Sequence, residues 1–513
     1  MPINITMVQA VIFSDATHSD EHADDRFFNV PVRSAGPYRI ATEIRNSGLD
    51  CFVLNFLFYF SLDEVERICK SLITKETLIV GFSTTFWFLP TNPTEYEHRK
   101  SILRIIVNRS REFPNLKLII GGTSARDYAD YFTADACFVG YAEPLLIEYV
   151  KCLIAKEDFR VVPNDVSLKN TPIYKYDQAS HKFDFNSSVI RYEPNDFIAN
   201  QESTVLEIAR GCIFKCKFCA YPLNGKSKLD YIKEAEIIRN ELINNYENYG
   251  ITNYTFSDDT FNDSTEKIKF LHDIFTNLPF KLQFGTYLRL DLLHAHREQI
   301  PLLKEMGLVA PFFGIETLSK KAGSNIGKSM DPRKSTDLLY DLKVKHWGSR
   351  IKIMVGLITG IPGEDQESFD ITKKWIADKD YCLVDRVRPA ALGIPNPLTD
   401  RSIWRSEFQI NASKYGFYWP DRNSSWKNLN SWTKTYDQAK QQASELAMIA
   451  ADNYRHKYGW SIMSFPSWSN NQKSLNSLLD MDRQSYSNWF DNNLQSMTTN
   501  FINDYKFKVL SLT

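Results

Sequence analysis

The chain has 513 residues, of which 43% are hydrophobic, a length that predicts two or three domains with sizeable cores. Its 61 Lys and Arg residues nearly balance 62 Asp and Glu residues, so the net charge of −1 gives no overall attraction to nucleic acid or to an anionic membrane. The longest apolar run, residues 51–60, is too short to span a bilayer, and no signal peptide is evident. We therefore expect a cytoplasmic globular protein.

Residues 1–155 alternate short apolar runs with amphipathic, helix-like segments. Repeated βα units of this kind predict an α/β domain with a Rossmann-like, doubly wound parallel sheet. In such folds a ligand binds beyond the carboxyl ends of the strands. We expect strands at 3–13, 51–57, 78–83, 116–122 and 136–139, and helices at 36–45, 62–74, 94–112 and 143–153.

Residues 156–200 are polar and contain three prolines, which indicates a linker that wraps over the surface. A second alternation of six βα units follows over residues 201–399. We expect its strands at 204–208, 253–256, 281–287, 310–315, 351–357 and 384–390, and helices at 231–246, 263–277, 296–306, 333–346 and 365–378. Residues 400–513 are rich in aromatic side chains and mainly helical in pattern, with one long amphipathic helix over 436–458.

Three cysteines, Cys212, Cys216 and Cys219, follow the first strand of the second alternation with C-x3-C-x2-C spacing. Such a loop supplies three thiolates to a 4Fe–4S cluster and leaves one iron open, as a catalytic metal site does. Three unrelated core cysteines are an alternative. A zinc site is a weaker one, because no fourth Cys or His follows at finger-like spacing.

The residues that flank these cysteines decide between the alternatives. Arg210 and Gly211 precede the first cysteine, and Phe218 precedes the third. With these flanks the motif resembles the radical S-adenosylmethionine (SAM) superfamily, and the six βα units resemble its partial (βα)6 barrel. The resemblance implies that the three cysteines hold the cluster and that SAM chelates the open iron. Reductive cleavage of SAM would then yield a 5′-deoxyadenosyl radical.

The resemblance also implies SAM contacts at the carboxyl ends of the strands. The residue after the cysteine loop, Tyr221, would offer its backbone carbonyl to SAM. Asp258 and Asp259 occupy the place where the family binds the SAM ammonium group; a helix N-cap is the alternative. We leave open which of the two aspartates acts.

Three later strands carry the remaining expected contacts. Arg289 would face the SAM carboxylate or a structural carboxylate, and Glu316 the SAM ribose or amino group, with an arginine-paired structural role as the alternative for Glu316. Backbone near Ile358 and Gly360 would approach the adenine, which a glycine permits. The family's Gly-Lys pair follows the fourth strand as Gly327-Lys328. No second cysteine cluster is visible, which argues against the methylthiotransferase and auxiliary-cluster branches.

The amino-terminal domain resembles the cobalamin-binding domain that precedes the barrel in one large branch of the superfamily. Four short segments carry this resemblance, at residues 36–41, 80–83, 119–122 and 140–143. It implies that the corrin lies against the strand-end loops, at Ser83, Thr84, Gly121, Gly122 and Gly140.

The motif D-x-H-x-x-G is absent, so no histidine of this chain is expected on cobalt. Residues 84–87 (Thr84, Thr85, Phe86 and Trp87) would face the lower side of the corrin or pack within the domain. A Rossmann-like domain without cobalamin is the alternative for the whole segment.

The resemblance implies a cobalamin-dependent radical SAM enzyme, whose commonest reaction is methylation of an unactivated carbon. A radical epimerase, cyclase or rearrangement enzyme is the first alternative, and a non-catalytic cluster or cobalamin sensor is the second. The expected partners are a small-molecule or peptide substrate and an electron donor such as flavodoxin or ferredoxin, without a membrane or nucleic acid. By the same resemblance the carboxyl-terminal region covers the barrel mouth and binds substrate, with exposed tryptophans such as Trp426 and Trp432; a packing cap is the alternative. The catalytic residues are not identified by the sequence.

Overall fold

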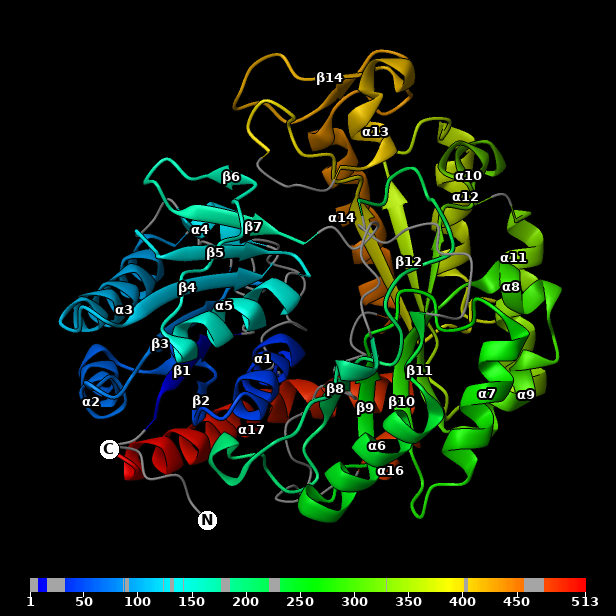
Figure 1. The fold of residues 1–513 in the computed structure, drawn as a ribbon. Coiled ribbons are helices and arrows are strands. Elements are labelled where there is room, and N and C mark those ends of the chain that lie inside the picture. Colours follow the sequence, from blue (N-terminus) through cyan, green and yellow to red (C-terminus); the bar gives the residue numbers. More distant parts are fainter. Residues whose placement is uncertain are drawn as a thin grey trace.

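The computed structural model shows two α/β domains side by side, joined at one end by the last helix of the chain (Figure 1). The structure describes residues 8–15, 33–85, 87, 92–122, 124–129, 133–141, 143–176, 185–220, 231–328, 330–400, 405–455 and 475–513. Within these residues no helix is long and apolar enough to cross a membrane.

The amino-terminal domain is a doubly wound sheet with the strand order β2-β1-β3-β4-β5-β7-β6. Its first five strands are parallel and, except at the ends of β3 and β4, fully buried, as expected for a sheet covered on both faces. One face packs on helices α1 and α5, and the other on α2 and α3. The strands are β1 (Ala10–Ser14), β2 (Cys51–Leu54), β3 (Ile79–Ser83), β4 (Lys117–Gly122) and β5 (Ala136–Val139), and the helices are α1 (Ala35–Asn46), α2 (Leu62–Leu72), α3 (Pro93–Arg111), α4 (Ala125–Ala129) and α5 (Glu143–Ala155).

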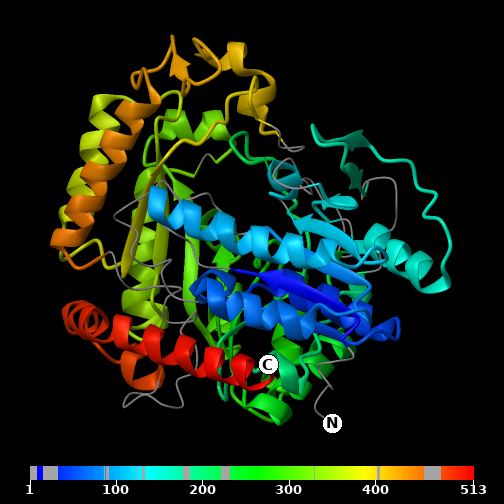
Figure 2. The same ribbon diagram turned by 90° about the vertical axis from the view of Figure 1, so that its left-hand side faces the viewer.

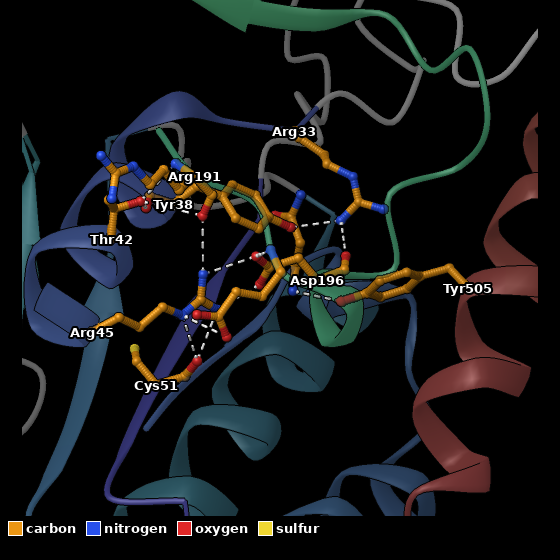
Figure 3. A network of polar contacts seen from close by, with 10 residues as sticks. Arg33, Tyr38, Thr42, Arg45, Cys51, Arg191, Asp196 and Tyr505 are labelled. Carbon is orange, nitrogen blue, oxygen red and sulfur yellow. Dashed lines mark hydrogen bonds and ion pairs between the residues drawn. The ribbon is translucent and has the colours of Figure 1, made fainter. Parts of the chain in front are cut away.

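The segment expected to be a linker extends this sheet. Strand β7 (Pro172–Lys175) pairs in parallel with β5, and β6 (Asp165–Val166) pairs antiparallel with β7. Further along, the buried Asp196 accepts two hydrogen bonds from Arg45, at 2.8 and 2.9 Å, and so ties the segment to α1 (Figure 3). The segment is therefore part of the domain's packing and not only a connection, because paired backbone groups and a buried carboxylate fix it.

The second domain is an open, six-stranded parallel sheet with the order β13-β12-β11-β10-β9-β8. Helices follow the strands and bury one large core between them and the sheet. This is the partial (βα)6 barrel that the sequence predicts. The strands are β8 (Thr204–Leu206), β9 (Asn253–Phe256), β10 (Gln283–Leu288), β11 (Leu308–Glu316), β12 (Met354–Thr359) and β13 (Arg386–Ala391), and the helices are α6 (Ala235–Tyr249), α7 (Thr265–Thr276), α8 (Leu290–Ala295), α9 (Gln299–Glu305), α10 (Lys320–Ile326), α11 (Pro332–Asp341) and α12 (Gln366–Ala377).

The carboxyl-terminal region divides between the two ends of the barrel. Helix α13 (Glu407–Ile410), strands β14 (Phe417–Tyr418) and β15 (Lys427–Asn428) and helix α14 (Tyr436–Asp452) pack near the carboxyl ends of β12 and β13. Helices α16 (Leu475–Leu479) and α17 (Arg483–Ser511) instead pack on Val309, Ala310 and Met354, at the amino ends of β11 and β12. The expectation that the whole region covers the mouth is therefore wrong for its last two helices.

Helix α17 also reaches the amino-terminal domain (Figures 1 and 2). Ile502, Tyr505 and Val509 belong to the same buried core as α2 and α3. The ring of Tyr505 packs edge-on against Phe56, and its hydroxyl accepts a hydrogen bond from the Asn55 backbone N–H at 3.0 Å. One helix thus completes the cores of both domains.

Candidate cluster and SAM site

The cysteine loop follows β8, at the carboxyl end of the barrel sheet. Its three cysteines are half-buried, and a turn closes where the Cys219 N–H donates to the Cys216 carbonyl at 3.0 Å. Three other cysteines behave as core residues: burial raises the pKa of Cys51 and Cys69 to about 12 and of Cys382 to about 11. Burial also raises the pKa of Cys212, so the loop cysteines differ from these core thiols in their greater accessibility.

Three hydrogen-bonding groups surround the loop sulfurs. The Arg289 Nη1 donates to Cys216 Sγ at 3.5 Å, and the Phe214 N–H donates to Cys212 Sγ at 3.4 Å. The Thr260 hydroxyl lies 3.2 Å from Cys212 Sγ. Donors and a cation suit thiolates that carry negative charge, so this environment fits an iron–sulfur cluster. Within the described ranges no three His, Cys, Asp or Glu side chains are arranged so that they could hold a single metal ion.

Arg289 pairs with a structural carboxylate of the protein, which is one of the two partners expected from the sequence. Its guanidinium forms a bidentate ion pair with Asp291, with distances of 3.0 and 2.6 Å, and lies over the Phe214 ring at 3.6 Å. Burial alone would raise the pKa of Asp291, but the Arg289 contact lowers it below its usual range. Arg289 is thus held by a structural carboxylate while it reaches the sulfur of Cys216.

The two aspartates after β9 have different surroundings. Asp258 is buried and forms an ion pair of 2.8 Å with Lys267, a lysine that is itself fully buried. Asp259 is exposed at the end of the strand. The N-cap alternative is wrong for both, because Ser264 caps α7 by accepting from the Lys267 N–H. Asp258 thus already has a cationic partner, which it shares with Asp263 at 3.4 Å, and Asp259 is the more accessible of the two aspartates.

Glu316 ends β11 in the left-handed region, with φ of 64°. Its carboxylate forms an ion pair of 2.8 Å with Lys328, which also donates to the Gly314 carbonyl at 2.6 Å. A Cβ atom at Gly314 would lie 2.4 Å from Glu316 Oε1, so only glycine leaves room for this arrangement. The partner of Glu316 is the lysine of the Gly-Lys pair and not an arginine.

Gly360 is approached by protein side chains. A Cβ atom there would lie 2.9 Å from Ala439 Cβ and 3.1 Å from the Trp426 ring, and the Gly360 N–H already donates to Glu364 at 3.0 Å. The close approach that we expected of adenine is thus made by the carboxyl-terminal region at this position. Ile358, two residues earlier, packs half-buried in the same apolar cluster as Phe218 of the cysteine loop.

The expectation of exposed tryptophans is wrong for Trp426. Its side chain is 1% exposed, and its indole N–H donates to the Leu392 carbonyl at 2.7 Å. Trp432 is half-buried and packs on Phe369. Trp426 therefore serves packing, since its ring fills the space above Gly360.

The strand ends of the amino-terminal sheet are packed on one another. The backbone N–H and the hydroxyl of Thr84 both donate to the Gly121 carbonyl, at 2.8 and 3.1 Å. Gly122, with φ of 118°, leaves room for Thr85, and the Gly140 N–H donates to the Gly122 carbonyl at 3.4 Å. Ser83 ends β3 half-buried, and Gly121 is likewise half-buried.

Of the two interpretations for residues 84–87, packing holds for Thr84 and Trp87. Thr84 is 0% exposed, and Trp87 is buried against Phe58, Phe82 and Tyr128. Tyr221 and Phe86 lie outside the described residues.

Comparison with known proteins agrees with this geometry. Residues 206–376 match the model of the Radical SAM superfamily, and this stretch contains the cysteine loop, Asp259, Arg289 and Glu316. Residues 206–376 therefore form a radical SAM domain. A search of curated sequences finds no significant match.

Two solved structures share the two-domain fold of this chain. The methyltransferase TsrM from Kitasatospora setae, with cobalamin and a [4Fe-4S] cluster bound, is 13% identical over 97% of this chain and 100% of its own, with a TM-score of 0.62. The cobalamin-dependent enzyme OxsB, with aqua-cobalamin and SAM bound, is 11% identical over 98% of this chain and 72% of its own, with a TM-score of 0.55. The predicted fold is confirmed, and the predicted radical SAM family is confirmed for residues 206–376.

Sequence reasoning missed a closed circuit of charges beside the radical SAM cluster loop. Arg210 forms a bidentate ion pair with Glu207, both distances 2.7 Å, and lies 3.3 Å from Glu143. Arg39 pairs with the same oxygen of Glu143 and lies 3.7 Å from Glu207. We call these four residues (Arg39, Glu143, Glu207 and Arg210) the charge ring. The flank of the cysteine motif pointed to Arg210, but nothing local in the sequence pairs it with residues 67 and 171 positions away.

Proposed function

We propose that the chain is a cobalamin-dependent radical SAM enzyme that cleaves SAM reductively and methylates an unactivated carbon of its substrate. The observation that carries the proposal is the cysteine loop, with its donors to sulfur, set against a doubly wound domain in one continuous fold. When bound, the cluster supplies an electron to SAM and cobalamin supplies a transferable methyl group.

In this proposal each part of the barrel end has a task for its own side chains. Cys212, Cys216 and Cys219 hold the cluster, while Arg289 offsets negative charge at Cys216. Asp259 meets the SAM ammonium group, because a carboxylate and a cation form a charge-assisted pair. Glu316 accepts from SAM with the oxygen that Lys328 does not hold.

The remaining expected contacts stay proposals. We propose that Ser83, Gly121, Gly122 and Gly140 border the corrin and that Ile358 lies against the adenine. Gly121 favours this for the corrin, since a Cβ atom there would meet only the Phe138 carbonyl, at 3.8 Å. Thr84 then acts by holding the strand ends together, because its side chain is buried.

The substrate class is proposed more coarsely. TsrM has been solved with a tryptophan substrate and a SAM analogue bound, with 14% identity to this chain over 79% of it and 76% of that chain and a TM-score of 0.60. We propose a small molecule or a peptide as the substrate of this chain, a flavodoxin- or ferredoxin-like electron donor, and a cytoplasmic location.

The deciding experiment measures SAM products after anaerobic reconstitution with iron, sulfide and hydroxocobalamin and reduction by dithionite. The wild-type protein should release 5′-deoxyadenosine, and S-adenosylhomocysteine as well if it transfers methyl groups. 5′-Deoxyadenosine alone would favour an epimerase, cyclase or rearrangement enzyme, and neither product would favour a sensor. The triple variant Cys212→Ala/Cys216→Ala/Cys219→Ala should lose both products and the cluster absorbance. Cys152→Ala, a half-buried thiol on α5, is the matched control and should lose neither.

A further inference from the structure

The charge ring lies at the junction of the two domains. Arg39 belongs to α1 and Glu143 begins α5, both in the amino-terminal domain. Glu207 and Arg210 belong to the stretch that leads from β8 into the cysteine loop, and Arg210 precedes Cys212 by two residues. The ring therefore joins the segment that carries the cluster to the start of the helix after β5.

The four charges of the ring can all pair at once in only one arrangement of the two domains. Each arginine contacts both glutamates, so positive and negative groups alternate around the circuit and their charges cancel. The two arginine side chains are 6% and 4% exposed, and both glutamates are 15% exposed. Partly desolvated charges interact strongly and are costly when unpaired, so a shift between the domains would separate charges that are largely shielded from water.

Neighbouring groups hold the ring in place. The Arg210 guanidinium lies 4.2 Å from the centroid of the Tyr141 phenol group, and the Ser188 hydroxyl donates to Glu207 at 2.9 Å. Burial would raise the pKa of Glu207, but Arg210, Arg39 and Lys233 lower it to about 2, so the Glu207 carboxylate is ionised at neutral pH. Tyr141 follows Gly140 directly, so the ring reaches the loop at the carboxyl end of β5.

We propose that the charge ring is a positioning device that fixes the cluster loop against the loop after β5, and so sets the separation between the two cofactors. The second half of this statement rests on the proposed function, because it places cobalamin at that loop. The first half concerns only this chain's own residues. None of the four ring residues needs to touch a substrate, SAM or a reacting atom.

The test compares variants on one helix. Arg39→Met removes the cation that the amino-terminal domain contributes to the ring. Arg45→Met, also on α1, removes a buried bidentate ion pair with Asp196 that does not contact the cluster loop. Hydrogen exchange is measured on the reconstituted full chain, and Arg39→Met should lose protection over residues 140–145 and 207–219. Arg45→Met should keep wild-type protection in both peptides, at a comparable loss of thermal stability.

A double variant that exchanges the charges of residues 39 and 143 distinguishes the four-residue charge ring from an isolated ion pair. In Arg39→Glu/Glu143→Arg the two exchanged residues still attract each other, but the new glutamate faces Glu207 and the new arginine faces Arg210. An isolated ion pair would recover wild-type protection after this exchange. The ring predicts a loss of protection at least as large as that of Arg39→Met.

A spectroscopic arm tests the separation of the cofactors. Protein loaded with hydroxocobalamin and reduced by dithionite should show a cob(II)alamin resonance whose relaxation is accelerated by the nearby reduced cluster. This acceleration should fall several-fold in Arg39→Met and stay at the wild-type level in Arg45→Met. If the wild-type protein retains no cobalamin, the proposed function fails while the exchange experiment still decides the ring. Unchanged exchange in Arg39→Met, or recovery in the double variant, overturns the positioning role.

Discussion

Two of the contacts between the amino-terminal domain and the rest of the molecule are built on buried arginines, and they differ in the groups that those arginines bind. In the charge ring every ion pair joins two side chains. In the second contact Arg33 donates to the backbone carbonyl of Asp196 at 3.0 Å, as Figure 3 shows. Arg33 also donates to the Phe197 carbonyl and pairs with Glu202 at 2.6 Å. Its guanidinium also lies 5.2 Å from the ring centre of Tyr505 on α17.

This difference separates positioning from stability. Backbone carbonyls cannot reorient without moving the chain, so Arg33 fastens the linker segment and α17 to the fold. The charge ring instead joins side chains of both domains, so all of its ion pairs form together at one relative position of the domains, and forming them favours that position. The contact next to the cluster is thus the one whose geometry depends on domain arrangement, and the remote contact is the one that the fold needs.

The strongest test of this comparison is Arg33→Met. The replacement leaves Glu202 without its cation in a fully buried place, which should cost about 3–5 kcal/mol in the free energy of unfolding. Urea unfolding followed by tryptophan fluorescence would measure it. Arg67→Met, which removes exposed hydrogen bonds to the end of the same helix α17, is the control and should cost less than about 0.5 kcal/mol. Equal losses of unfolding free energy in Arg33→Met and Arg67→Met would mean that the Arg33 contact is not the one that the fold needs.

Tyr505→Phe should have a smaller effect at the same contact. It keeps the ring packing on Phe56 but removes the acceptor of the buried Asn55 N–H, which should cost about 1–3 kcal/mol. The same urea titration applies, with Tyr418→Phe at an exposed position as the control. A loss no larger than that of the control would mean that α17 is held by apolar packing alone.

Glu143→Gln should lower global stability least among the three buried changes. The amide oxygen can still accept from Arg39, so we expect a loss of about 1 kcal/mol, from a weaker hydrogen bond. Local exchange over residues 207–219 should nevertheless increase, whereas Tyr505→Phe should leave it unchanged. The opposite pattern would assign the ring to stability and the remote contact to positioning.

The pH dependence should be the smallest effect. A carboxylate with a lowered pKa stabilises above its ordinary value of 4.5 and loses this contribution as the pH falls toward about 2. Exchange protection of the cluster loop should therefore be constant from pH 8 to pH 5, after correction for intrinsic exchange rates, and should fall below that. Glu207→Gln should remove the acidic part of this dependence. A change between pH 8 and pH 6 would mean that another group controls the loop.

Local sequence patterns were sufficient to predict most of the strands and helices and the cysteine loop. The spacing of Cys212, Cys216 and Cys219 and the six βα units of the barrel depend on neighbours in the sequence, because turn geometry and strand alternation are short-range properties. The same holds for the five parallel strands of the first sheet. Residues 172–175 were missed as a strand because they are short and contain a proline, and their pairing with β5 and β6 forms only in the folded sheet.

Pairings between distant residues were decided only by the tertiary structure. Asp258 is buried against Lys267 while Asp259 is exposed, a difference that two adjacent aspartates in the sequence do not reveal. Trp426 fills the space above Gly360, and α17 completes two cores at the far end of the barrel. Chemistry at a loop follows from the residue types that it contains. The partner that buries or neutralises each of them depends on which surfaces meet when the domains pack, and the sequence holds no local record of that.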